Sequence, residues 1–114
     1  MAYNEKLADR IRERLAELPT VEEKAMMGGL TFMVNDKMCV GIIKDELMCR
    51  IDPEIHDAVI EKTGCRTMEF TKRPMKGYVM IDNSGLNTDK EFDFWIRLSL
   101  DFNKQAKASK KRKR

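Results

Sequence analysis

Short runs in which apolar and polar side chains alternate place the strongest constraint on the fold of this 114-residue chain. A period of two is typical of β-strands. The connections between the runs are rich in Asn and Asp, which tolerate the positive φ of tight hairpin turns. The pattern therefore predicts a four-stranded antiparallel meander, with helices on one face because both faces are apolar. The runs are residues 24–27, 30–34, 38–43 and 47–51.

Helical patterns stand before and after this meander. Residues 2–18 carry one apolar face and stop at Pro19, which disfavours helix in the residue before it. Asp52-Pro53-Glu54 is a typical helix start, and the second helix should end near Gly64. Two further strands are expected after it, at residues 67–70 and 77–81. Together these elements predict a small α+β domain.

The segment 92–102 carries two conflicting signals. Its apolar residues alternate as in a strand, but Thr88 and Glu91 just before it form a helix capping box. We expect a helix from 88 to about 107, on which apolar side chains would span roughly 240° instead of one stripe. The second apolar side would face the first helix or a second copy of the chain. Its candidate self-association residues are Phe94, Trp95 and Leu98.

Charge is distributed unevenly between the body and the C-terminal residues. Seven of the 22 basic residues and none of the 19 acidic ones lie in residues 104–114. We therefore expect an acidic domain over residues 1–103 and a basic, disordered tail over 104–114. The tail predicts weak, non-specific contact with nucleic acid, without base stacking because no aromatic residue is interleaved. The candidate contacts are Lys107, Lys110, Lys111, Arg112, Lys113 and Arg114.

Composition argues against several classes of protein. No apolar run approaches the roughly 18 residues of a membrane-spanning helix, and the start of the chain lacks an export signal. The three separated cysteines fit neither a disulfide scaffold nor a zinc site and favour a cytoplasmic location. Gly28-Gly29 is expected in a bulge or a tight turn between strands, not in a phosphate-binding loop. His56, the only histidine, is expected on the surface, so neither an enzyme nor a cofactor is predicted.

The nine methionines suggest a surface that adapts to a partner. Methionine fills irregular gaps in cores, and it also serves flexible binding surfaces. Most of those in strands are expected in the core. The candidate partner surface combines exposed residues near Met26-Met27 and near Met75, and comprises Met26, Met27, Arg73, Met75 and Lys76.

Two blocks of this sequence resemble the N-terminal domain of the TfoX/Sxy family. The first, residues 23–35, reads EKAMMGGLTFMVN and continues through MCVG at 38–41 and LMCRI at 47–51. The second, residues 68–79, reads MEFTKRPMKGYV, and Asp93-Phe94-Trp95 matches the family's late aromatic helix. The resemblance covers roughly residues 3–103. The sequence departs from the family at Met27, where Phe is usual, and at Asp36 and Lys72, where Gly is usual.

The resemblance implies both a fold and a role. The implied fold is a two-layer α+β domain, an antiparallel sheet with helices in the order α-β(3-4)-α-β(2)-α, similar to secretion-chaperone-like folds. The implied role is in competence-type transcription, where relatives act as co-activators alongside the cyclic-AMP receptor protein. No catalytic residue is implied.

Two hypotheses of different classes follow. The first is a non-enzymatic, regulatory binding domain that contacts a protein partner such as a transcription regulator and also forms a homodimer. The second is a nucleic-acid-associated accessory protein that uses its basic tail. An enzyme would require a pocket with shifted titratable groups.

Overall fold

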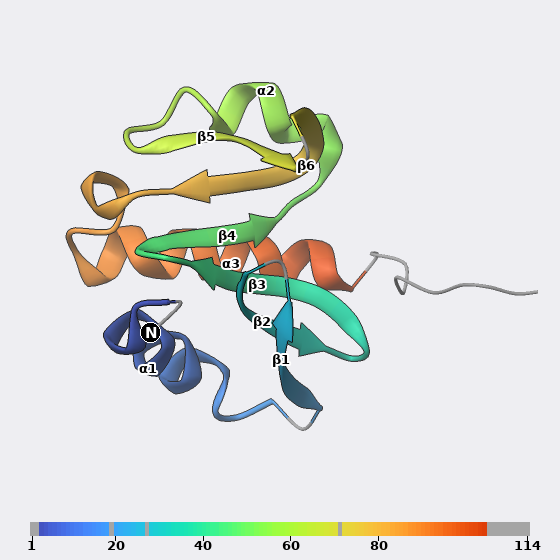
Figure 1. Ribbon diagram of the computed structural model, residues 1–114, viewed down its shortest axis with the longest axis vertical. Coiled ribbons are helices and arrows are strands. Elements are labelled where there is room, and N and C mark those ends of the chain that lie inside the picture. The colour runs from blue at the N-terminus through green and yellow to red at the C-terminus, as the bar shows by residue number, and fades with distance from the viewer. Residues whose placement is uncertain (1–2, 19, 27, 71, 105–114) are drawn as a thin grey trace, which may run out of the picture.

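A six-stranded antiparallel sheet forms the centre of the molecule (Figure 1). The computed structural model describes residues 3–18, 20–26, 28–70 and 72–104. The strands are β1 (Val21–Met26), β2 (Gly29–Val34), β3 (Lys37–Ile43), β4 (Glu46–Arg50), β5 (Cys65–Phe70) and β6 (Arg73–Ile81). Their order across the sheet is β1-β2-β3-β4-β6-β5, so the first four form the predicted meander and β1 and β5 are the edges.

The helices follow the predicted order. They are α1 (Glu5–Leu15), α2 (His56–Val59) and α3 (Asp89–Asn103), with short 3₁₀ turns η1 (Pro53–Ile55) and η2 (Asn83–Gly85). The predicted first helix is too long at its start because Asn4 is the N-cap and its side chain accepts hydrogen bonds from the N–H groups of Lys6 and Leu7. The α+β class and the helix–strand order are therefore confirmed.

Turn chemistry explains why the strands pair as they do. Asn35 and Asp36, between β2 and β3, have φ of 54° and 65°, as the hairpin between these strands requires. Gly28 has φ of 76° in the turn between β1 and β2. A Cβ atom on Gly29 would lie 1.9 Å from the carbonyl oxygen of Ile42 on β3, so only glycine permits this close pairing. The tight turn predicted at these glycines is confirmed.

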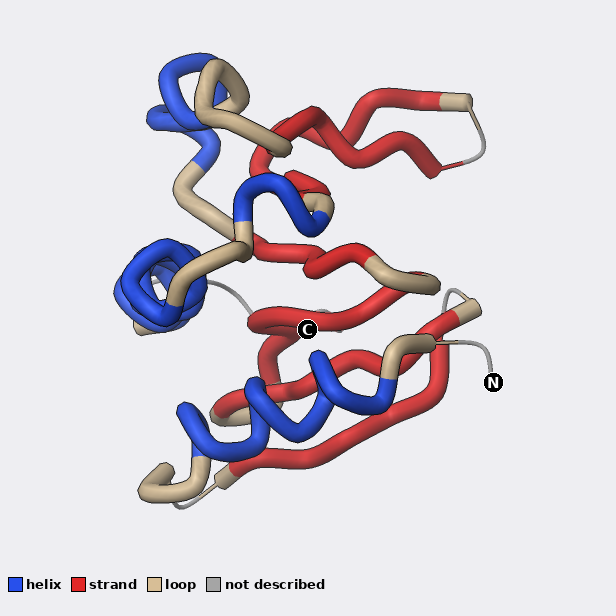
Figure 2. The backbone as a smooth tube through the Cα atoms, turned by 90° about the vertical axis from the view of Figure 1, so that its left-hand side faces the viewer, coloured by secondary structure: helices blue, strands red, loops and turns tan. Residues whose placement is uncertain are grey.

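Helices cover one face of the sheet. In Figure 1, α3 passes behind β3 and β4, and in Figure 2 the helix is viewed along its axis at the outer side of the molecule. Its buried residues lie on one side: Phe92, Trp95, Ile96, Ser99 and Asn103. Within one copy of the chain, the buried side of α3 faces the sheet and α1 contacts one flank of the helix through Arg14. Burial of its outer side against a second copy stays a prediction. The flanking Leu98, Leu100 and Phe102 are only half-buried.

The alternation of the strands separates two apolar clusters. The larger lies between the sheet and the helices and includes Phe32, Ile42, Leu47, Val79 and Ile81. The smaller lies on the other face and consists of Met33, Met38, Met48, Met68 and Met80, with Ile43 and Tyr78 packed against it. Among the described residues, no helix is long and apolar enough to cross a membrane.

Candidate functional site

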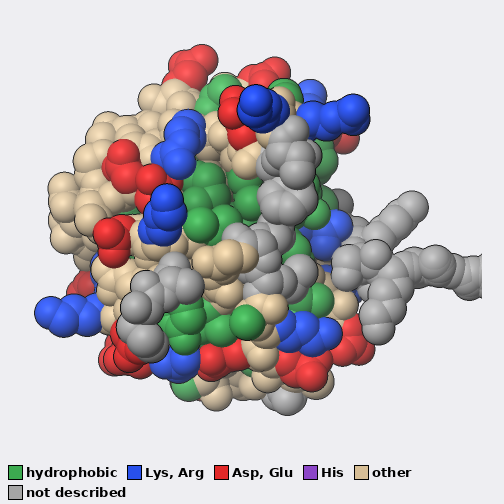
Figure 3. Space-filling model, viewed as in Figure 1, with side chains coloured by type: hydrophobic (Ala, Val, Ile, Leu, Met, Phe, Trp, Pro, Cys, Tyr) green, Lys and Arg blue, Asp and Glu red, His purple; other side chains and the backbone are tan. Residues whose placement is uncertain are grey.

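The methionine cluster opens into a hollow at one edge of the sheet. Met33 pairs with Met38 and Met48 with Met80 across neighbouring strands, so their side chains share one face. Figure 3 shows hydrophobic side chains gathered in a hollow on this face, with charged groups around it. The hollow has a volume of about 630 Å³. It is lined by Ile43, Arg66, Thr67, Met68, Glu69 and Met80, which we call the methionine hollow.

Charged side chains of both signs stand at the rim of the methionine hollow. Arg66 and Glu69 are exposed on β5, and Arg66 forms an ion pair with Glu46 at the start of β4. Because β5 is an edge strand, its outer backbone groups have no strand partner within the described part of the chain. The floor is apolar and flexible, since Met68 and Met80 provide it. An edge strand beside methionine side chains can contact an extended polypeptide segment.

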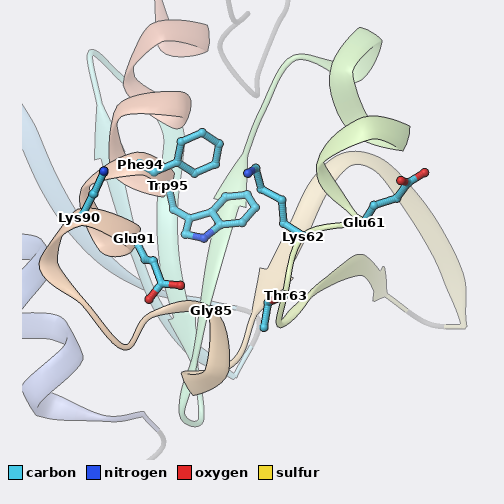
Figure 4. Close-up of a pocket in the computed structure, with 8 residues that line it drawn as sticks. All are labelled: Glu61, Lys62, Thr63, Gly85, Lys90, Glu91, Phe94 and Trp95. Carbon is cyan, nitrogen blue, oxygen red and sulfur yellow. The ribbon is translucent and has the colours of Figure 1, made fainter.

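A second hollow, the α3 groove, lies between α3 and the loop that follows α2 (Figure 4). It has a volume of about 440 Å³ and is lined by Glu61, Lys62, Thr63, Gly85, Lys90, Glu91, Phe94 and Trp95. The ring centroids of Phe94 and Trp95 are 5.0 Å apart in an edge-to-face arrangement. Lys62 Nζ lies 4.7 Å from the centroid of Phe94, within range of a cation–π contact.

Local hydrogen bonds fix the walls of the α3 groove. Thr88 caps α3, accepting from the N–H of Glu91 while the Glu91 carboxylate accepts from the N–H of Thr88, so the predicted capping box is confirmed. Next to Gly85, which lines the groove, the hydroxyl and N–H of Ser84 donate to Asp82. These bonds stabilise the carboxylate and lower the pKa of Asp82.

The three candidate self-association residues have different exposures. Phe94 is 39% exposed, the largest exposed hydrophobic side chain among the described residues, whereas Trp95 is only 2% exposed. Leu98 is half-buried. Trp95 therefore belongs to the core beneath Phe94, and only Phe94 presents a large apolar surface to solvent.

The candidate partner surface is not one patch of neighbouring strands. Met26 ends β1, while Arg73, Met75 and Lys76 lie at the start of β6, and three strands separate β1 from β6. Met27 lies outside the described residues. Arg73 and Lys76 are exposed and Met75 is half-buried. Sequence reasoning missed the methionine hollow because the signal, one methionine on the same face of each of five neighbouring strands, requires the strand register.

His56 is buried, which corrects the prediction of a surface histidine. Its side chain is 3% exposed and Nδ1 accepts a hydrogen bond from the N–H of Gly77 at 2.9 Å. The proton of the neutral ring is therefore on Nε2, which donates to Oγ1 of Thr67 at 2.8 Å. Both ring nitrogens thus have structural partners.

The remaining candidates are the three cysteines and the basic C-terminal residues. Cys39 and Cys49 are buried and Cys65 is partly exposed, all as free thiols. Within the described ranges, no group of three His, Cys, Asp or Glu side chains could hold a metal ion. The candidate nucleic-acid contacts from Lys107 to Arg114 lie outside the described residues.

Comparison with known proteins gives one match. The family model for the TfoX N-terminal domain matches residues 13–103. No curated protein and no solved structure matches the chain.

Proposed function

This chain belongs to the TfoX N-terminal domain family, and from that membership we propose that it is a non-enzymatic regulatory domain that binds a protein partner through the methionine hollow. The observation that carries the proposal is the hollow of about 630 Å³ lined by Met68, Met80 and charged residues, on the sheet face opposite α3 and bordered by an edge strand. A cytoplasmic location is part of the proposal, supported by the free thiols of Cys39, Cys49 and Cys65.

The shape of the methionine hollow favours an extended segment of a partner. Such a segment could pair with the outer backbone groups of β5 and place apolar side chains against Met68 and Met80. Thioether side chains change rotamer at low cost, so they accommodate partner side chains of different shape. Arg66 and Glu69 at the rim would select a segment with charges of both signs.

The only imidazole in the chain supports a binding role over a catalytic one. Both nitrogens of His56 are engaged by Gly77 and Thr67. A general base needs a free lone pair within reach of a substrate, which this ring does not offer.

Methionine-methyl NMR of the full chain tests the proposal. The probe is purified cyclic-AMP receptor protein, because relatives in the resembled family act alongside it. We expect the methyl signals of Met68 and Met80 to shift, and Glu69→Lys to weaken binding about tenfold. Glu22→Lys, the matching change on the other edge strand, should leave binding unchanged. Unchanged Met68 and Met80 signals, or equal effects of the two variants, would contradict the proposal.

The nucleic-acid alternative rests on the seven basic residues from Lys104 to Arg114. A DNA duplex serves as the second probe in the same titration. Replacing Lys110, Lys111, Arg112, Lys113 and Arg114 with glutamine should abolish binding that depends on the tail and reduce its salt dependence. Salt-sensitive DNA binding without any change at Met68 or Met80 would favour this alternative.

A further inference from the structure

The outermost line of α3 carries four exposed side chains in a regular spacing. Lys90, Phe94, Arg97 and Asp101 are separated by four, three and four residues, so they form one row along the helix, which we call the α3 stripe. The row lies opposite the buried side formed by Phe92 and Ser99. Spacings of four and three are those of the contact line between two packed helices.

The charges of the α3 stripe have no partners within the described part of the chain. Lys90, Arg97 and Asp101 form no ion pair there. By contrast, Asp89 and Asp93 lie on the side of α3 toward α1, and both form ion pairs with Arg14 of that helix. The stripe is thus a row of exposed charges without an ion-pair partner in that part of the chain, with one exposed aromatic ring among them.

The α3 stripe is complementary to itself when a second copy is placed antiparallel. If the two-fold axis passes midway between Trp95 and Ile96, Lys90 of one copy lies opposite Asp101 of the other. Phe94 then lies opposite Arg97, which suits a guanidinium over an aromatic face. All four side chains gain a favourable partner. A parallel arrangement would place each charge against its own kind, which is unfavourable.

The surroundings of α3 leave room for a second helix. The α3 groove lies on one side of the stripe. On the other side, a hollow of about 500 Å³ is lined in part by Leu18, Ile96 and Leu100. The helix therefore stands as a ridge between two depressions, at the outer side of the molecule (Figure 2).

From this pattern of charge we infer that two copies of the chain form a symmetric dimer through antiparallel contact of their α3 stripes. The inference is independent of the proposed function, because α3 and the methionine hollow lie on opposite faces of the sheet. A dimer of this kind leaves both methionine hollows open. Since Phe94 is the only large exposed apolar side chain in the contact, we expect a weak dimer with a dissociation constant of order 10–100 µM.

Sedimentation equilibrium of the full chain tests the dimer, from about 1 µM to about 1 mM. Lys90→Glu and Asp101→Lys should each weaken association about tenfold, because the two-fold axis makes every pair occur twice. The double variant Lys90→Glu/Asp101→Lys should restore association. In 0.5 M salt, where charges are screened over roughly 4 Å, the wild-type dimer should be weaker. Phe94→Ala should abolish it.

Lys6→Glu, a charge reversal at an exposed position of α1, is the matched control and should not change association. All of the substituted side chains are exposed, so circular dichroism should show an unchanged fold. A protein that stays monomeric throughout, or a double variant that associates no better than the single ones, would overturn the inference. Either result would leave the methionine-methyl test of the proposed function unaffected.

Discussion

The imidazole of His56 and the backbone of Gly77 are joined by a hydrogen bond of 2.9 Å that holds the short helix α2 against β6. Gly77 has φ of 91°, a conformation that side chains disfavour, and its N–H points at Nδ1 of the ring. The second nitrogen binds Thr67 on β5. One buried side chain therefore connects α2 to both strands at this edge of the sheet.

Replacement of His56 should destabilise the protein substantially. His56→Ala leaves the N–H of Gly77 and the hydroxyl of Thr67 without partners and opens a cavity, so we expect a loss of about 2–4 kcal/mol in the free energy of unfolding. His56→Asn keeps an acceptor near the position of Nδ1 and should lose less. Urea denaturation measures both variants, and a loss below about 0.5 kcal/mol for His56→Ala would show that these bonds are unimportant.

Residues with local signals were predictable from the sequence, and those whose role depends on strand register were not. Asn35 and Asp36 predicted the turn between β2 and β3 because these residue types tolerate positive φ. Thr88 and Glu91 predicted the start of α3. His56 gave no such signal, because its burial depends on hydrogen bonds to Thr67 and Gly77, which lie 11 and 21 residues further along the chain.

The exposure of residues on α3 and the lining of the candidate site also depend on packing that the sequence does not show. A wheel of the sequence assigns Phe94 and Trp95 to one broad apolar arc, but the sheet buries Trp95 and leaves Phe94 outside. Likewise, Met68 and Met80 line a common hollow although they lie on different strands, whose pairing the sequence does not state.

Lys72 occupies a position that favours glycine. Its φ is 64°, in the turn between β5 and β6, and the left-handed region is costly for a residue with a Cβ atom. Lys72→Gly should therefore raise the free energy of unfolding by about 0.5–1 kcal/mol, partly offset by the greater freedom of glycine in the unfolded chain. Thermal denaturation should show a midpoint a few degrees higher, on the order of 2–6 °C.

Gly64 also has a positive φ, so replacing this glycine is the reverse of the Lys72→Gly test. It has φ of 78°, and a Cβ atom there would lie 2.6 Å from Oδ1 of Asp82. Gly64→Ala should lower the free energy of unfolding by at least about 1 kcal/mol. If Lys72→Gly lowered stability as well, backbone conformation would not be the deciding factor at the β5–β6 turn.

Hydrogen bonds of Asn103 connect the end of α3 to the turn between β2 and β3. Its Nδ2 donates to the carbonyl of Val34 at 3.1 Å, its Oδ1 accepts from Asn35, and its own carbonyl accepts from Lys37 Nζ at 2.9 Å. The side chain is 3% exposed, so Asn103→Ala should cost about 1–3 kcal/mol. Asp101→Ala, two residues earlier and exposed, should change the free energy of unfolding by less than about 0.5 kcal/mol in the same denaturation experiment.

The buried thiols should make the protein lose stability at alkaline pH. Burial raises the pKa of Cys39 to about 12 and raises that of Cys49 as well, because a thiolate is poorly solvated in the core. In the unfolded chain a thiol ionises near pH 8.5, by the usual rough value. The stability that each neutral thiol contributes is thus fully present below about pH 8.5 and is lost as pH rises toward about 12.

Denaturation at a series of pH values tests this dependence. Between pH 8.5 and pH 10 each of the two thiols should lower the free energy of unfolding by up to about 2 kcal/mol. Cys39→Ala and Cys49→Ala remove one ionisable group each, so both variants, although less stable at neutral pH, should show a shallower decline. The ionisation of lysine and tyrosine is common to all three proteins and cancels in the comparison. Equal slopes for the wild type and both variants would mean that other groups cause the alkaline loss.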